Sequence, residues 1–423
     1  MITERAGPTQ FLILADESAE WKIAGLQQLD RIILALNEFA ESSGSETTFD
    51  IAVFWKPDSP VLGRRLPHDQ RMIRVRVHER LDAVAPGAQV LSTRLFVDRD
   101  GLAKFLQIAW VMKLEHSILE PDKVWRELFD QFLRSCATDE NGHGWHVLKG
   151  RSDLSKCTRK FLNDAGKPQD GMVSRFLNRL ISRLVTRALV KYPISPTVWT
   201  ISIFILPLLA SAFLLRGDYA SVVAGAALFQ LYSILDGCDG EIARAKYLES
   251  ERGARLDDFC DTLGSLLFVI ALGFGLARVH SSSAYAIEGI VCAIAIGANE
   301  WFLRSFLPET DRFRSLHPSF ARPGPPTPAT AGSTALTQTL YSRHRGLVQN
   351  SGLLLLGENF VHWVFQLTKR DVAILFFLLL ALANLPQWIL HLWLTIAAVT
   401  LVLSGLARFR VSTDRGAAVP PRS

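Results

Sequence analysis

The 423-residue chain contains few cysteines, and their positions exclude two common roles. The five cysteines form no CxxC pair and no spacing typical of metal ligands. We therefore expect no disulfide framework, and reduced cytosolic or membrane-buried thiols are the simpler interpretation. The first ten residues, MITERAGPTQ, also lack the basic and then apolar stretches of a secretory signal peptide. We expect the first half of the chain to stay in the cytoplasm.

A strong overall charge is absent as well. The net charge of +5 is modest, and we expect no nucleic-acid partner. The placement of the charge is more informative, because arginines and lysines crowd the ends of long apolar stretches. Residues 1–165 have the mixed charges of a soluble domain, whereas residues 197–407 contain several stretches near the ~20 residues that span a bilayer.

The first 165 residues alternate between strand-like and helix-like segments. Short apolar runs predict strands, and apolar residues at helical spacing predict helices. The predicted strands cover residues 10–15, 49–55, 72–77 and 89–97, and the predicted helices cover residues 25–40 and 101–118. This alternation predicts an α/β sheet domain over residues 1–165.

Residues 166–196 predict a basic amphipathic helix beside the membrane. Arg175, Arg179, Arg183 and Arg187 recur every four residues and therefore line one face, while apolar residues fill another. A helix of this kind suits the membrane interface, with its arginines facing anionic lipid headgroups. The alternative is an ordinary soluble helix packed on the first domain.

Six membrane spans are predicted in residues 197–410. They cover about 197–215, 219–236, 258–279, 284–303, 371–386 and 388–407. Basic residues gather in the connections on one side of these spans, which places both termini in the cytoplasm. We therefore expect a multi-pass α-helical protein of the cell inner membrane, with the α/β domain in the cytoplasm. Residues 321–339 predict a disordered loop, residues 350–367 an amphipathic helix, and residues 411–423 a tail.

Aspartates close the second predicted span and open the third in a fixed pattern. The pattern DxxDGxxAR, eight residues, and GxxxDxxxD holds the following positions: Asp236, Asp239, Gly240, Ala243, Arg244, Gly253, Asp257 and Asp261. With each residue type at ~5–8% of average usage, eight fixed positions match by chance on the order of once in 10^10 starts. A solvated acidic face does not explain such interlocking spacings beside a bilayer, where carboxylates are costly.

The spacing predicts that the carboxylates converge. Asp236 and Asp239 share one helix face, as do Asp257 and Asp261, and the short connection brings the two helix ends together. Four unpaired carboxylates would repel each other, and Mg²⁺ or Mn²⁺ resolves this, because both favour oxygen ligands. Gly240 and Gly253 allow backbone to approach a bulky ligand. Arg244 is a natural partner for phosphate oxygens.

This string, DGCDGEIARAKYLESERGARLDDFCD, resembles the signature of the CDP-alcohol phosphotransferases, an integral-membrane family. The resemblance implies six transmembrane helices, two metal ions per site and a homodimer. It also implies transfer of a phosphoalcohol group from a CDP-alcohol donor to an acceptor hydroxyl, with release of CMP.

The same resemblance implies a role for each matching residue. Asp236, Asp239 and Asp257 would be metal ligands, and Asp261 would be the general base and a further metal ligand. Three residues, Gly240, Arg244 and Gly253, would hold the CDP moiety, with Ser250 a weaker candidate. Many members carry Pro-Asn-x-x-Thr before the first span, where this chain reads PTVWT at residues 196–200.

The first domain resembles sugar-phosphate nucleotidyltransferases over residues 11–45. Their Gly-rich loop normally holds nucleotide phosphates, and LADESAEWK replaces it here. We therefore expect a degenerate domain with a structural or regulatory role. The junction KPQDGMVSRFLNRLISRLVTRAL resembles fused proteins that join an inositol-1-phosphate cytidylyltransferase to a di-myo-inositol phosphate-type synthase. This favours a polar donor such as CDP-inositol, with CDP-diacylglycerol as the competing donor.

Two alternatives from other classes remain. In the first alternative, the chain is a catalytically inactive membrane scaffold with a cytosolic partner-binding domain, and the intact signature argues against this. It is a transporter in the second, but transport sites usually lie at the bilayer midplane rather than at its surface. Arg304, Lys369 and Arg370 either bind a phosphate on the acceptor or simply reflect topology.

Overall fold

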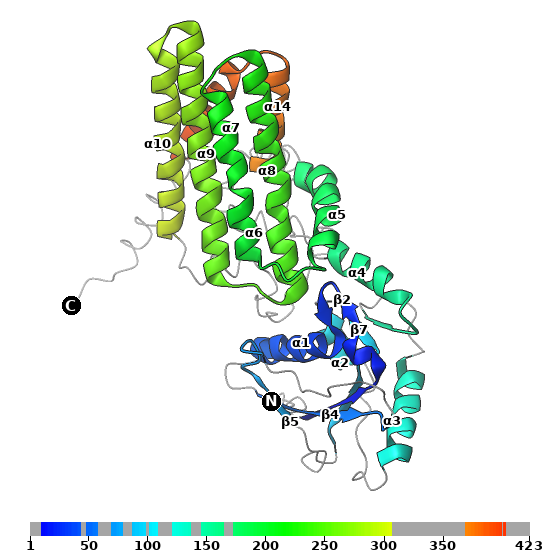
Figure 1. Ribbon diagram of the computed structural model, residues 1–423. Coiled ribbons are helices and arrows are strands. Elements are labelled where there is room, and N and C mark those ends of the chain that lie inside the picture. The colour runs from blue at the N-terminus through cyan, green and yellow to red at the C-terminus, as the bar shows by residue number, and fades with distance from the viewer. Residues whose placement is uncertain are drawn as a thin grey trace, which may run out of the picture.

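The computed structural model has two parts, a helical bundle and a smaller α/β domain beneath it (Figure 1). It describes residues 10–43, 48–57, 69–78, 87–98, 101–108, 121–136, 145–164, 172–306, 369–399 and 401–402. The predicted loop at 321–339, the predicted helix at 350–367 and the tail at 411–423 lie outside these residues.

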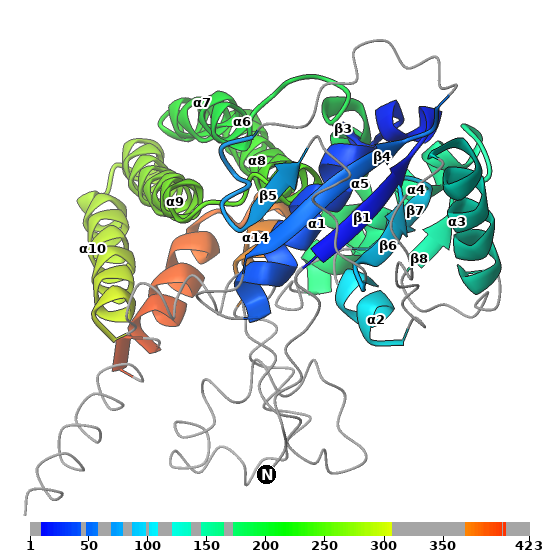
Figure 2. The same cartoon turned by 90° about the horizontal axis from the view of Figure 1, so that it is seen from below.

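A parallel sheet forms the centre of the α/β domain. Its four strands lie in the order β5 (Val75–His78), β4 (Phe49–Trp55), β1 (Gln10–Ala15) and β6 (Gln89–Ser92), as Figure 2 shows. All neighbouring pairs are parallel. Five of the six β1 residues are buried, because helices cover both faces of such a sheet. The predicted α/β domain is confirmed.

Helices on each face complete the core of this domain. Helix α1 (Gln28–Ser43) packs Ile33 and Leu36 against one face. On the other face lies α3 (Pro121–Cys136), where Trp125 Nε1 donates to the carbonyl of Phe54 at 3.0 Å. The described part of the predicted helix at 101–118 is α2 (Gly101–Ile108).

Three predicted elements differ from the structure, and one of them is the strand predicted at 72–77, which begins three residues later as β5. The strand predicted at 89–97 is two strands, because a turn at Thr93 and Arg94 separates β6 from β7 (Leu95–Val97), which pairs with β8 (Trp145–Val147). The helix predicted from residue 25 begins three residues later. Residues before it form the hairpin of β2 (Lys22–Ile23) and β3 (Leu26–Gln27), whose turn residues Ala24 and Gly25 have φ of 47° and 85°.

The helical bundle begins with a helix that has one short break. Helices α6 (Pro196–Ile203) and α7 (Ile205–Leu214) follow each other, and then come α8 (Tyr219–Lys246), α9 (Glu251–His280) and α10 (Ser283–Phe306). The last described helices are α14 (Arg370–Leu382) and Gln387–Val399. Phe229, Phe268 and Phe377 pack between α8, α9 and α14, with ring centroids 4.5 Å apart in the first pair and 6.3 Å apart in the second.

Three helical segments of the described residues are long and apolar enough to cross a membrane. They are Pro196–Leu214, Tyr219–Lys246 and Glu251–His280. Helix α14 has 13 residues and is about 20 Å long, short of a hydrocarbon core of about 30 Å. The six-span topology therefore remains a prediction.

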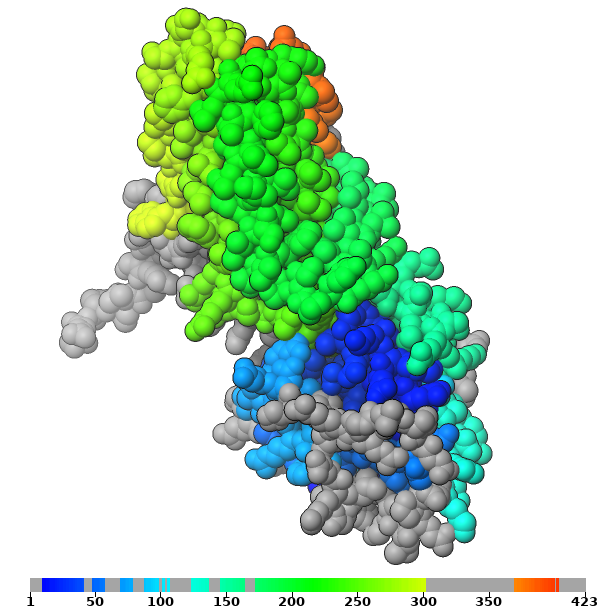
Figure 3. Space-filling model, viewed as in Figure 1, coloured from blue at the N-terminus to red at the C-terminus, as the bar shows by residue number. Residues whose placement is uncertain are grey.

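A short linker of helices joins the two parts. It contains α4 (Asp153–Asp164), a π-helical turn (Ser174–Asn178) and α5 (Arg179–Leu189). Figure 3 shows the α/β domain in direct contact with the lower end of the bundle. The C-terminal end of α8 docks there, because Arg31 Nη2 donates to the carbonyl of Ala245 at 3.0 Å and Arg71 Nη1 donates to that of Tyr247 at 3.1 Å. These arginines satisfy carbonyls that a helix end leaves open.

Candidate active site

Three of the predicted aspartates meet between α8 and α9. Asp236 on α8 and Asp257 and Asp261 on α9 each offer one carboxylate oxygen, and these oxygens lie within 4.8 Å of one another. All three side chains are partly buried. The spacing places them on facing sides because α8 and α9 run in opposite directions from a connection of only four residues, 247–250.

Asp239 stands apart from this group. Its side chain is buried, and its Oδ2 accepts a hydrogen bond of 2.5 Å from Thr200 Oγ1 on α6. Asp239 therefore lies outside the group of three, and its role as a metal ligand stays a prediction. The helical spacing puts Asp236 and Asp239 one turn apart, but α6 draws the second carboxylate toward itself.

Asp261 is held by two side chains from other helices. Tyr232 Oη on α8 donates to its Oδ1 at 3.1 Å, and the Arg370 guanidinium at the start of α14 forms an ion pair with its Oδ2. Arg370 also lies over the Tyr232 ring, 5.8 Å from its centroid. Sequence reasoning did not consider Tyr232, although its place one helical turn before Asp236 in an apolar run could have marked it.

A pocket beside the aspartates collects the residues predicted to hold the nucleotide. Its lining includes Gly240, Arg244, Ser250, Gly253, Asp239 and Asp257, together with Pro196, Thr197 and Thr200 of the PTVWT segment. A Cβ atom on Gly240 would lie 3.1 Å from Arg244 Nη1, so the glycine leaves room for this guanidinium. Ser250 caps α9, because its hydroxyl accepts from the amide of Gly253 at 3.1 Å.

Glu241 anchors the signature helix to α5, and the sequence analysis missed it. The side chain is buried, and its Oε1 accepts from Arg179 Nη1 at 2.9 Å and from Ser182 Oγ at 2.8 Å. Thr186 Oγ1 donates to its Oε2 at 2.7 Å. The prediction that the arginine row faces lipid headgroups is therefore wrong for Arg179, which turns inward because a buried carboxylate needs a charged partner. A carboxylate directly after the signature glycine was the available signal.

The three clustered aspartates suit a hard divalent cation. Carboxylate oxygens are the ligands that Mg²⁺ and Mn²⁺ prefer, and three of them at this separation can bind one ion together. Like charges so close also repel each other, and a cation removes that repulsion.

In the α/β domain, an ion pair of Asp16 and Arg94 occupies the place where open parallel sheets usually bind a ligand. Ligands of open parallel sheets bind beyond the carboxyl ends of strands where the strand order reverses, here between β1 and β6. Asp16 follows β1 there and is buried, and Arg94 Nε donates to its Oδ2 at 2.7 Å. The Arg94 guanidinium lies 5.1 Å from the Trp21 ring centroid. A buried carboxylate at this place disfavours a phosphate group.

Comparison with known proteins identifies the class of the helical part. Residues 194–355 match the model of the CDP-alcohol phosphatidyltransferase family, and this segment is a CDP-alcohol phosphatidyltransferase domain. The matched range contains all eight signature positions, and its residues from 307 onward lie outside the described part of the chain.

Similar proteins point in the same direction. The chain is 32% identical to a protein of Archaeoglobus fulgidus over 162 residues, which is 38% of this chain and 32% of that protein. It is 36% identical to a protein of Rubrobacter xylanophilus over 166 residues, 38% of this chain and 37% of that protein. Both relatives are named bifunctional IPC transferase and DIPP synthase. The similarity thus spans about a third of each relative's length.

Proposed function

We propose that this chain is a membrane-bound transferase that moves a phosphoalcohol group from a CDP-alcohol to an acceptor hydroxyl and releases CMP. The observation that carries the proposal is the grouping of Asp236, Asp257 and Asp261 within 4.8 Å, inside a segment that matches the family. The adjoining pocket, with Arg244 and two glycines in its lining, supports a nucleotide beside the aspartates.

The proposed reaction assigns a step to each group. The acceptor oxygen forms a bond to the phosphorus that carries the alcohol, the bond from that phosphorus to CMP breaks, and the hydroxyl proton passes to Asp261. Arg244 holds the pyrophosphate of the donor. Arg370 pairs with Asp261 in the structure, and we propose that it turns to the acceptor when the acceptor binds.

Asp236, Asp257 and Asp261 would hold a divalent ion, and Asp239 would join them as a further ligand while its Oδ2 stays bonded to Thr200. Two bound Mg²⁺ or Mn²⁺ ions would supply charge neutralisation at the pyrophosphate and at the departing CMP phosphate. Thr200 orients Asp239 through its hydrogen bond of 2.5 Å, as residues behind metal ligands commonly do.

The names of the relatives favour a donor with a polar alcohol, such as the CDP-inositol expected from the fused proteins, over CDP-diacylglycerol. The remaining features of the proposal are six spans, a homodimer, a cytoplasmic active site and a place in the inner membrane. The exposed apolar residues Phe176, Leu180 and Leu184 support the location of the linker helices at the membrane interface. We further propose that the α/β domain has a structural role, which the Asp16–Arg94 pair supports.

The first test measures CMP release by the purified protein in detergent with Mg²⁺. CDP-inositol and CDP-diacylglycerol are offered separately with candidate acceptors. We expect release from one donor, a loss of roughly 1,000-fold or more in Asp261→Asn, and retention in Glu251→Gln, a half-exposed carboxylate on the same helix. Failure of every donor with a protein that still binds Mn²⁺ would favour the scaffold alternative, and equal activity of both variants would exclude Asp261 as the base.

A further inference from the structure

A second, larger pocket lies where the α/β domain meets the linker helices. It has a volume of about 990 Å³ and is formed by the β2–β3 turn, α4, α5, the segment after α5 and the last residue of α8. Its walls are joined by hydrogen bonds, because the amide of Ala24 donates to Thr158 Oγ1 at 3.3 Å and Lys246 Nζ donates to the carbonyl of Tyr192 at 2.6 Å. The volume is in the range of pockets that hold small ligands.

The charge of this pocket has one sign. Its lining contains five basic residues and no carboxylate, and the basic residues are Lys22, Arg159, Arg187, Lys191 and Lys246. Within the described part of the chain, none of the five takes part in an ion pair. The Nε atom of Arg187 is buried and has no hydrogen-bond partner among the described residues. Five cations around one cavity repel each other, so an anion in the cavity would stabilise the arrangement.

An apolar row leads to the mouth of the pocket. Phe176, Leu180 and Leu184 follow one another at intervals of four residues, and they are 73%, 64% and 58% exposed. Leu184 also lines the pocket. Such a row on an amphipathic helix suits the acyl-chain boundary of a bilayer, and basic groups beside it suit lipid phosphates.

We propose that this pocket binds the phosphate group of an anionic lipid, with the headgroup among the five cations and the acyl chains along the row of Phe176, Leu180 and Leu184. The same chemistry would accept a soluble phosphate monoester, and the test separates these two sources. The proposal does not rest on the transferase activity, since the pocket shares no lining residue with the candidate active site.

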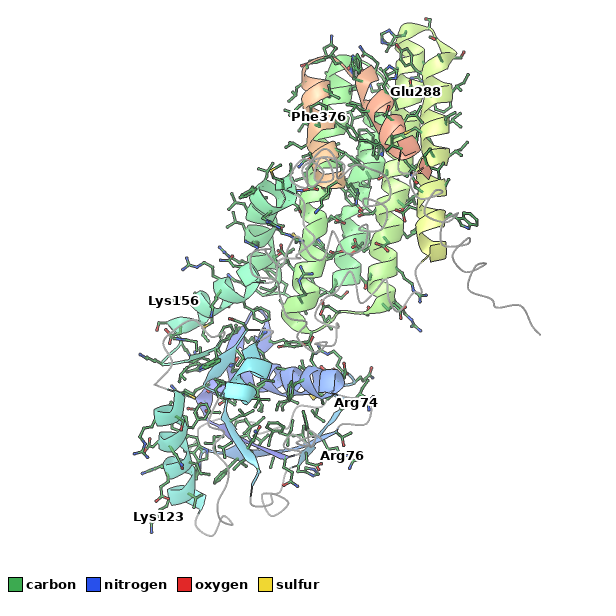
Figure 4. All side chains as sticks on the ribbon, turned by 180° about the vertical axis from the view of Figure 1, so that it is seen from behind. Arg74, Arg76, Lys123, Lys156, Glu288 and Phe376 are labelled. Atoms are coloured by element: carbon green, nitrogen blue, oxygen red, sulfur yellow. The ribbon has the colours of Figure 1, made fainter. Side chains whose placement is uncertain are left out.

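The test compares two triple variants of the full chain with equal changes of charge. The pocket variant, K22Q/R159Q/K191Q, neutralises three exposed residues of the lining. The control variant neutralises three exposed basic residues that do not line the pocket, K149Q/R151Q/K156Q, of which Lys156 is marked on Figure 4. Thermal unfolding is followed in neutral detergent micelles that contain phosphatidylglycerol or, at the same mole fraction, phosphatidylcholine. A further arm adds soluble glycerol 3-phosphate without charged lipid.

We expect phosphatidylglycerol to raise the apparent Tm of the unmodified chain by roughly 5 °C at saturation, relative to phosphatidylcholine. The pocket variant should lose most of this rise and the control variant should keep it. A pocket-dependent rise with glycerol 3-phosphate alone would assign the site to a soluble phosphate. Equal responses of the two variants, or no rise with either ligand, would overturn the proposal.

Discussion

The buried pair of Arg179 and Glu241 gives the sharpest prediction of stability. Replacing Arg179 by Met leaves the Glu241 carboxylate, only 1% exposed, with two hydroxyl donors and no countercharge. Removing one partner of a buried pair costs about 3–5 kcal/mol. Since 1 kcal/mol shifts Tm by about 2–4 °C in a domain of this size, we expect a fall of roughly 10 °C.

The double variant R179M/E241Q separates charge from packing. Glutamine removes the unpaired charge, and its carbonyl and amide still bond with the hydroxyls of Ser182 and Thr186. A buried ion pair replaced on both sides is often nearly neutral, so the double variant should recover more than half of the lost stability. R175M changes an exposed arginine one helical turn earlier and should shift Tm by about 2 °C or less.

The assay is the unfolding of each purified variant in one detergent, followed by tryptophan fluorescence. A rescue by the second substitution is the signature of a charged pair. If the double variant is as unstable as the sum of its two single variants, the two residues act independently and the anchoring role assigned to Glu241 is wrong.

Three further predictions test the parts around this anchor. Thr200→Val removes the hydroxyl that holds Asp239 and should raise the Mg²⁺ concentration for half-maximal CMP release about 10-fold or more. Thr200→Ser retains a hydroxyl and should leave this concentration unchanged. The same Mg²⁺ dependence in Thr200→Val would show that Thr200 does not orient this carboxylate. Gly25→Ala should lower Tm by more than Gly87→Ala does. Both glycines have positive φ, but a Cβ atom at Gly25 would meet a carbonyl oxygen at 2.2 Å, whereas one at Gly87 would meet nothing within 4 Å. Equal shifts in Tm would contradict the close contact at Gly25. Burial raises the pKa of the Cys157 thiol to about 11, which leaves about one thiolate in 1,000 at pH 8. Alkylation of this thiol should therefore be slow until high pH, and it should accelerate in Gly25→Ala if that substitution opens the domain contact. Fast alkylation of the unmodified chain would show that this core is open.

Elements whose signal is local were predicted closely. The strands at 10–15 and 49–55 match β1 and β4 residue for residue, because each is a continuous apolar run in a buried parallel sheet. The break between β6 and β7 was missed, since Thr93 and Arg94 sit in an otherwise strand-like run. Their turn is stabilised by partners far away in the sequence, including Asp16.

The candidate site shows the same division. Helical spacing correctly brought Asp236, Asp257 and Asp261 to one place, because these residues lie on two helices joined by a short connection. It could not predict that Asp239 would accept a hydrogen bond from Thr200 on α6, nor that Arg179 would turn inward to pair with Glu241. A repeat of four residues defines a face of a helix, but the neighbour that this face contacts depends on the packing of the bundle.

The contacts of α8 suggest why a chain without the Gly-rich loop still needs its first domain. Glu241 joins the signature helix to α5, and Asp239 joins it to α6. Its last turn bonds through Lys246 to the segment after α5, and Arg31 and Arg71 of the α/β domain also hold it. Arg31 is fully buried and its guanidinium also lies 4.5 Å from the Phe161 ring centroid, so this contact is part of a folded core rather than a surface pairing. Because the turn from α8 to α9 begins at this point, we expect this contact with the α/β domain to help fix the angle at which the aspartates of the two helices face each other.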